Sequence, residues 1–256
     1  MILVVDVGNT SVSLGLYKND ELVDFSGFIY PKDISAMGIE LVLKKIFPNT
    51  NIENCIISSV ADELTGQVQQ AILQTYHVHP LIINTDLNLG INIKAKNTEN
   101  IGADRIANAY GASKIYDKRP LIVIDSGSAT TFDIVDSDNN FIGGLIMPGL
   151  GLQLKSLSEN TSKLPVLDLN LIDKVQTYIN TDTKKAILSG VVFGHAQAIQ
   201  GLITRCEKEL KAKAFVVGTG GNAKLLSKYM KYKKFNVVNP TLTLDGIKMI
   251  FDLNID

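Results

Sequence analysis

The chain has 256 residues, a length that suits one large domain or two modest ones. Its 25 Lys and Arg residues nearly balance 26 Asp and Glu residues, so bulk charge gives no reason to expect a nucleic-acid partner. The two cysteines lack partner spacing, which predicts a protein of the reducing cytoplasm without disulfides or a zinc site. We find no basic or apolar leader and no stretch near the roughly 18 apolar residues of a membrane helix, so no membrane partner is expected.

The first 30 residues predict an antiparallel meander of three strands. An apolar run over residues 2–5 ends in the turn Asp6-Val7-Gly8-Asn9-Thr10, and residues 11–17 alternate small or polar with apolar side chains. A second turn at residues 18–20 precedes a third stretch over residues 21–30.

The same pattern returns 119 positions later (125 − 6), where Asp125 falls on Asp6 and Gly127 on Gly8. An apolar run over residues 121–124 precedes this second acidic turn, and further strands are expected over residues 129–135 and from residue 141 onward. Matching strands, turns and acids indicate an internal duplication, and hence two domains of similar topology, residues 1–117 and 118–256.

Helices and strands alternate after each meander, which is typical of an α/β protein. Helical periodicity is predicted over residues 35–47, 63–76, 104–116, 183–210, 225–230 and 244–251, and short strands over residues 55–59, 81–83 and 215–217.

Each acidic turn has the residue types of a phosphate-binding loop. Backbone N–H groups with the side chains of Asn9, Thr10 and Ser11 suit phosphate oxygens, while Asp6 suits a hydrated Mg²⁺. Asp125 is expected to face the first loop across a cleft. The alternative for the first turn alone is an ordinary hairpin.

Two further motifs carry candidate chemistry. In Gly102-Ala103-Asp104-Arg105, Asp104 would accept the proton of an attacking hydroxyl and Arg105 would hold an anionic group, although a helix N-cap with a surface arginine fits the same spacing. Gly218-Thr219-Gly220-Gly221 follows a strand and suits close approach to a base or ribose, or a plain helix entry. The three histidines show no metal-ligand spacing, and surface or helix-packing roles are expected.

In this order the motifs closely resemble type III pantothenate kinases, members of the actin-like, sugar-kinase-like and Hsp70-like superfamily. The resemblance runs from Met1 to about Gly246, and besides the turns above it rests on Ser128-Ala129-Thr130, Gly143-Gly144-x-Ile146-x-Pro148-Gly149 and Thr183-x-x-Ala186-x-x-x-Gly190. It implies an α/β fold of two duplicated ribonuclease H-like (actin-like ATPase) domains around a central cleft.

The resemblance also implies an activity, the ATP-dependent phosphorylation of the primary hydroxyl of pantothenate toward coenzyme A. It implies Asp104 as general base, Mg²⁺ held by Asp6, a monovalent cation (K⁺ or NH₄⁺) at Asp125, and a homodimer. Pantothenate would be contacted by Gly102, Ala103, Asp104, Arg105 and Thr183. ATP would be contacted by Asp6, Val7, Gly8, Asn9, Thr10, Ser11, Val12, Ser13, Ser128, Gly220 and Gly221.

The sequence departs from the family pattern at three positions. Ser128 stands where the family usually has Thr, and Ala95 and Thr98 stand where a pocket Tyr and a Pro are usual. Two alternative functions also fit the sequence: a noncatalytic regulatory accessory factor of the same family, and a superfamily kinase or phosphatase with another substrate such as a sugar or polyphosphate.

Overall fold

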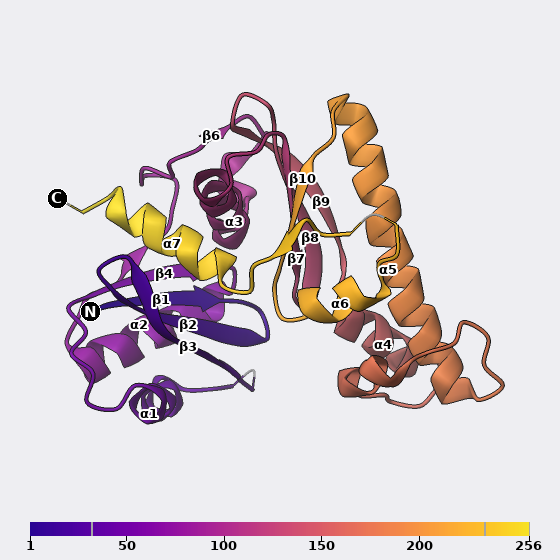
Figure 1. The fold of residues 1–256 in the computed structure, drawn as a ribbon. Coiled ribbons are helices and arrows are strands. Elements are labelled where there is room, and N and C mark those ends of the chain that lie inside the picture. Colours follow the sequence, from indigo (N-terminus) through magenta and orange to yellow (C-terminus); the bar gives the residue numbers. More distant parts are fainter. Residues whose placement is uncertain (32, 233, 256) are drawn as a thin grey trace. The chain divides into compact units, whose positions relative to one another are not determined.

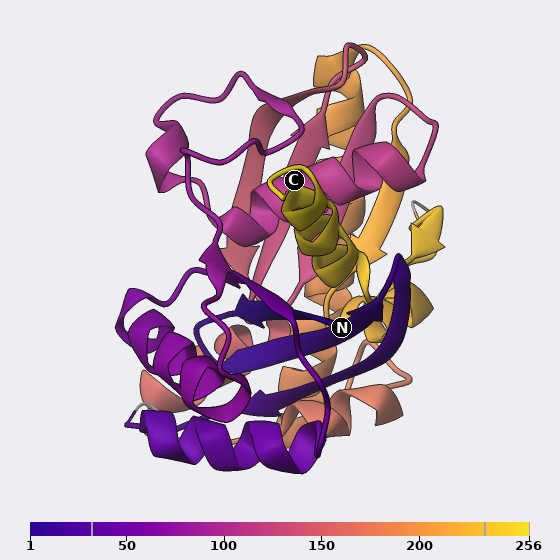
Figure 2. The same ribbon diagram turned by 90° about the vertical axis from the view of Figure 1, so that its left-hand side faces the viewer.

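The computed structural model describes residues 1–31, 33–232 and 234–255. The chain folds into two compact units, with Met1–Ile115 and Leu242–Asp256 in unit 1 and Tyr116–Thr241 in unit 2. Figures 1 and 2 show that each unit is built from a twisted sheet with helices packed on it.

Unit 1 is organised by a sheet with the strand order β3-β2-β1-β4-β5. The predicted meander is β1 (Ile2–Val7), β2 (Ser11–Lys18) and β3 (Glu21–Ile29), paired antiparallel, while β4 (Asn54–Ser59) and β5 (Leu81–Ile82) extend the sheet in parallel. Alternation along β1 sends Leu3 and Val5 into one apolar cluster and Val4 into another, so both faces of the sheet are buried.

One face of this sheet carries α1 (Ala36–Ile46) and α2 (Asp62–Tyr76), and the other carries α3 (Ala103–Ile115) and α7 (Leu242–Asp252) (Figure 2). The short elements β6 (Asn92–Ile93) and η1 (Thr98–Asn100) precede α3. Ser35 caps α1 by accepting a hydrogen bond from the Gly38 amide, as expected for serine before an apolar helix.

The predicted second domain of residues 118–256 is wrong at its C-terminal end, because α7 returns to unit 1. The two glycines Gly111 and Gly246 let α3 and α7 cross closely: a Cβ on Gly111 would lie 2.9 Å from the Gly246 Cα. The Tyr17 hydroxyl also donates to Asp245 Oδ1 at 2.7 Å. Sequence periodicity reveals that residues 244–251 are helical, but it does not reveal which sheet they cover.

Unit 2 repeats the topology of unit 1, with β11-β10-β7-β8-β9 as the order of its own strands. Strands β7 (Leu121–Ser126), β8 (Ala129–Val135) and β9 (Asn140–Pro148) form the antiparallel meander, and β10 (Phe215–Thr219) and β11 (Val237–Val238) add in parallel. Each meander has a register shift between its second and third strands, at Leu16/Tyr17 and at Ile134/Val135. This shared order and irregularity agree with the predicted duplication.

The helices of unit 2 are α4 (Leu150–Glu159), α5 (Thr183–Leu210) and α6 (Ala223–Tyr229), with the 3₁₀ helix η2 (Leu169–Lys174). They bury an apolar cluster against Ile122, Ile124 and Phe132 of the sheet. By length and composition α5 is apolar enough to cross a membrane, but more than half of its most apolar window is buried inside unit 2. Core packing accounts for its composition.

Candidate active site

The first acidic turn lies between β1 and β2, at the end of a strand whose other residues are mostly buried. The Gly8 amide donates to the Ser11 carbonyl at 3.0 Å, and the Tyr30 hydroxyl donates to the Gly8 carbonyl at 2.6 Å. Asn9 and Thr10 are exposed at the tip. The turn is therefore held at its base and presents polar groups to solvent.

Asp6 is fixed from the neighbouring parallel strand. The hydroxyl of the fully buried Ser58 on β4 donates to Asp6 Oδ1 at 3.1 Å. Val7 and Val12, two of the predicted ATP contacts, place their side chains in the core, so only their backbone atoms remain for a nucleotide. Ser11 and Ser13 are partly exposed.

Asp104 lies near the same edge of the unit 1 sheet. The Val60 amide donates to the Val7 carbonyl at 3.0 Å, and a Cβ on Gly102 would lie 3.1 Å from the Val60 Cγ1. That Cβ would also collide with Asp104 Oδ1. Glycine at position 102 therefore lets the Asp104 carboxylate fold back over the chain beside the end of β4.

Asp104 is the second residue of α3, so it belongs to the first helical turn rather than to the N-cap. Its Oδ1 accepts a hydrogen bond from the Arg105 amide at 2.8 Å. Burial raises the pKa of the Asp104 carboxyl above its ordinary value, while that hydrogen bond and the Arg105 charge act in the opposite direction. A desolvated carboxylate at a helix N-terminus suits a general base.

The second acidic turn contacts the glycine turn that follows β10. Asp125 is paired with Thr219 across β7 and β10, and a Cβ on Gly220 would collide with Asp125 Oδ1. Gly220 has φ +82°, a left-handed conformation that favours glycine. The Asn222 amide donates to the Ser126 carbonyl at 2.9 Å and closes the arrangement.

A third glycine segment reaches the same turn. The Gly149 amide donates to the Ser128 carbonyl at 3.0 Å, and a Cβ on Gly149 would collide with the backbone carbonyls of the 127–128 turn. Beside Asp125, the buried hydroxyls of Ser126 and Thr219 find no hydrogen-bond partner among the residues that the structure describes. Unit 2 thus brings together three motifs that lie far apart in sequence, with Ser128 exposed at their surface.

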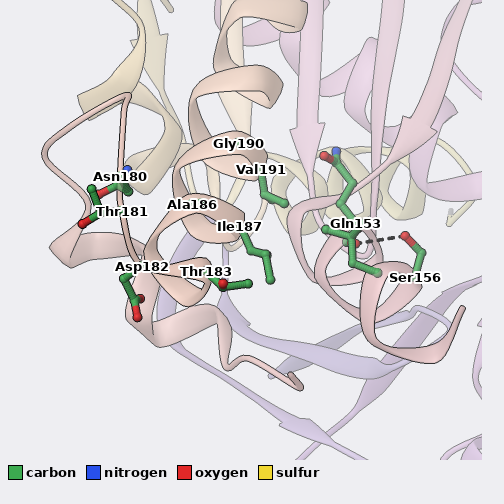
Figure 3. Close-up of a pocket in the computed structure, with 11 residues that line it drawn as sticks. Gln153, Ser156, Asn180, Thr181, Asp182, Thr183, Ala186, Ile187, Gly190 and Val191 are labelled. Carbon is green, nitrogen blue, oxygen red and sulfur yellow. Dashed lines mark hydrogen bonds between the residues drawn. The ribbon is translucent and has the colours of Figure 1, made fainter. Parts of the chain in front are cut away.

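Thr183 opens α5 and lies in a groove between α4 and α5 with a volume of about 610 Å³. Asp182 caps the helix by accepting from the Lys185 amide at 2.9 Å. Figure 3 shows Gln153 and Ser156 on one side of the groove and Ile187 and Val191 on the other. Its remaining lining residues are Leu157, Asn180, Thr181, Ala186 and Gly190.

Several residues of this arrangement escape the sequence patterns. Ser58 and Tyr30 support the first turn, and Gln153 lines the groove, yet none belongs to a predicted motif. Ser58 lies in the predicted strand over residues 55–59, but the local pattern does not say which strand pairs beside it. Gln153 lies in a helix that the sequence does not reveal, because Gly149 and Gly151 conceal the periodicity of α4. Ala95 lies half-buried in the loop after β6.

The acidic turns offer carboxylate and hydroxyl oxygens, the kind of metal ligand that Mg²⁺ prefers. Among the described residues no three His, Cys, Asp or Glu side chains cluster closely enough to hold a metal by themselves. Mg²⁺ commonly keeps several waters and binds one or two carboxylates together with substrate phosphates, which the single carboxylate of Asp6 fits.

Comparisons with known proteins agree with these features. A family model described as type III pantothenate kinase matches residues 2–205. Type III pantothenate kinases from Exiguobacterium sibiricum and Halalkalibacterium halodurans are 32% and 31% identical, over 99% and 100% of this chain and 100% of each relative. The crystal structure of MreB 5 of Spiroplasma citri bound to AMPPNP superposes with a TM-score of 0.56 at 11% identity, covering 98% of this chain and 96% of that one.

The structural likeness identifies an actin-like fold, as the motifs predict. The two full-length relatives and the family model carry the assignment further, because they share sequence along nearly the whole chain. The chain belongs to the type III pantothenate kinase family.

Proposed function

We propose that this chain transfers the γ-phosphoryl group of ATP to the primary hydroxyl of pantothenate, giving 4′-phosphopantothenate and ADP. Family membership supports the substrates, and the desolvated carboxylate of Asp104 is the observation that supports the chemistry. Asp104 accepts the hydroxyl proton as the oxygen bonds to the γ-phosphorus and the bond to the ADP oxygen breaks.

Substrate positioning falls to the segment around Asp104 and to the start of α5. Gly102 and Ala103 bring backbone close to the acceptor alcohol, and the Arg105 guanidinium holds an anionic group of the substrates. Thr183 supplies a hydroxyl at the α4–α5 groove. These assignments rest on the motif match and on the exposed position of Thr183.

ATP binding is assigned to the glycine turns. The backbone and polar side chains of residues 6–13 receive phosphate oxygens, and Ser128, Gly220 and Gly221 lie against the nucleotide. The positive φ of Gly220 and the exposed tip at Asn9 and Thr10 support this assignment.

Two cations complete the proposed site. Mg²⁺, held by Asp6 through water, would neutralise phosphate charge when bound. A monovalent cation, K⁺ or NH₄⁺, is assigned to Asp125, where the unpartnered hydroxyl of Thr219, the residue paired with Asp125 across β7 and β10, supports a bound ion. We further propose a cytoplasmic homodimer; exposed apolar residues on β9 and α4, including Ile146 and Leu152, support an interface.

The test follows ADP release and phosphorylated pantothenate with Mg²⁺ present, with and without K⁺. Product is expected only with both substrates, and its rate should rise with K⁺. No product at high enzyme concentration would overturn the proposal, and binding of both substrates without product would favour the accessory-factor reading. Screening other hydroxylated metabolites by thermal shift would expose a different acceptor. Analytical ultracentrifugation tests the proposed homodimer, for which a mass of twice that of one chain is expected.

A further inference from the structure

A buried histidine in unit 2 connects the second acidic turn to the α4–α5 groove. His195 of α5 is 2% exposed, and its Nε2 lies 3.0 Å from Thr130 Oγ1 on β8. Its Nδ1 lies 2.7 Å from Gln153 Nε2 on α4. The imidazole therefore bridges two side chains that belong to different elements.

The hydrogen bonds assign one tautomer to this imidazole. Gln153 Nε2 also donates to the Pro148 carbonyl at 2.9 Å. Because a carbonyl only accepts, the nitrogen of the Gln153 carboxamide, and not its oxygen, faces Pro148 and His195. His195 Nδ1 must then accept from Gln153, and Nε2–H must donate to Thr130. Burial lowers the pKa of His195 to about 4, so the ring is neutral at pH 7 and keeps this pattern.

The same bonds commit both protons of the Gln153 amide and leave its carbonyl oxygen available. Gln153 Oε1 accepts no hydrogen bond from the part of the chain that the structure describes, and the residue lines the groove. Without His195 the carboxamide would lose one of the two contacts that fix its orientation.

The rest of the groove is suited to a mostly apolar ligand segment with a neutral donor. Ile187 and Val191 supply apolar surface opposite Gln153 (Figure 3), and Leu157 also lines the groove. Asn180 is already committed, because its Nδ2 donates to the Thr177 carbonyl and to Ser189 Oγ. Gln153 Oε1 can only accept a hydrogen bond, so the ligand group that meets it is an O–H or N–H.

We propose that Gln153 is a specificity-determining acceptor for an O–H or N–H of pantothenate, and that His195 is a positioning residue that fixes its carboxamide. This inference rests on the proposed function. Gln153→Met removes the acceptor and with it one neutral hydrogen bond. In this variant KM for pantothenate should rise about three- to tenfold, while kcat and KM for ATP stay within about twofold.

Substitutions at His195 separate its two nitrogens. His195→Asn retains an acceptor near the position of Nδ1 and should keep KM for pantothenate near the wild-type value. His195→Gln retains a donor near the position of Nε2 but offers Gln153 no fixed acceptor, so its KM should rise as in Gln153→Met. Because the two residues act as a unit, the double variant should show no further rise.

Circular dichroism melting is measured for every variant, since a purely structural role would lower Tm and kcat together. Gln153→Met replaces a half-buried side chain and supplies the test even where His195 variants fold poorly. A wild-type KM for pantothenate in both Gln153→Met and His195→Gln would overturn the inference. The proposed function would still stand in that case, provided that the wild-type chain phosphorylates pantothenate. A wild-type chain that does not phosphorylate pantothenate overturns the proposed function instead.

Discussion

The hydroxyl of Ser58 donates to Asp6 Oδ1 at 3.1 Å, so the end of β4 fixes the acid that ends β1. Ser58 is fully buried, so its hydroxyl cannot turn toward solvent and donate to water instead of to Asp6. The contact positions the carboxylate that we assign to Mg²⁺, and it gives the first prediction.

Ser58→Ala should raise KM for ATP about three- to tenfold, because the Asp6 carboxylate loses a directed donor. Steady-state kinetics at fixed Mg²⁺ measures the change. Ser59→Ala is the matched control: the Ser59 hydroxyl accepts from the Ala61 amide at 3.2 Å and from Thr65, beside the start of α2. That variant should keep the wild-type KM for ATP, and equal changes in both variants would contradict the assignment.

Asp104→Asn should lower kcat by about 10²- to 10⁴-fold, since an amide cannot accept the hydroxyl proton. Binding of pantothenate should change far less, because asparagine keeps the size of the side chain. Full activity in this variant would eliminate Asp104 as the base. In the wild type the raised pKa of Asp104 shifts the acidic limb of the kcat profile to higher pH than an ordinary aspartate would give, as a pH series can show.

The same carboxyl should cost stability when it ionises. Its pKa is higher in the folded chain than in the unfolded one, so the folded state binds the proton more tightly. The free energy of unfolding therefore falls as pH rises from the ordinary value through the raised one. Asp104→Asn should be more stable than the wild type at pH 7, and the difference should shrink on acidification. Urea titrations at several pH values measure it, and a less stable variant at pH 7 would contradict this account.

Gly220→Ala should lower the free energy of unfolding by about 1–3 kcal/mol and weaken ATP binding. The added Cβ meets Asp125 Oδ1 and the Ser126 backbone at a residue with φ +82°. Gly221→Ala provides the control for stability, because its Cβ would meet nothing within 4 Å. The free energies of unfolding of the two variants, measured with denaturant, should differ clearly. Similar values would contradict a close contact between Asp125 and residue 220.

Gly246→Ala should destabilise unit 1 by about 1–3 kcal/mol. The new Cβ would collide with the Ala107 carbonyl, and α7 would be pushed from α3, the helix that carries Asp104. Gly66→Ala in α2 has open space at its Cβ and should stabilise by about 0.5–1 kcal/mol through helix propensity. Denaturant unfolding measures both changes, and an undisturbed Gly246→Ala would contradict the close crossing.

The sequence alone determined the two meanders, the acidic turns and most helices. Those features depend on residues near one another in the chain: apolar alternation, a glycine after a buried acid, a cap before an amphipathic run. The motif order also sufficed for the family, since each motif is short and local.

Tertiary structure alone decided which distant segments support one another. Periodicity shows that residues 244–251 form a helix, but only the close crossing of Gly111 and Gly246 returns that helix to the first unit. The Ser58 hydroxyl reaches Asp6 because parallel pairing aligns two strands about fifty residues apart, and His195 reaches Gln153 only through the packing of α5 on α4. Such contacts form between surfaces that fold together, and no local pattern specifies the partner.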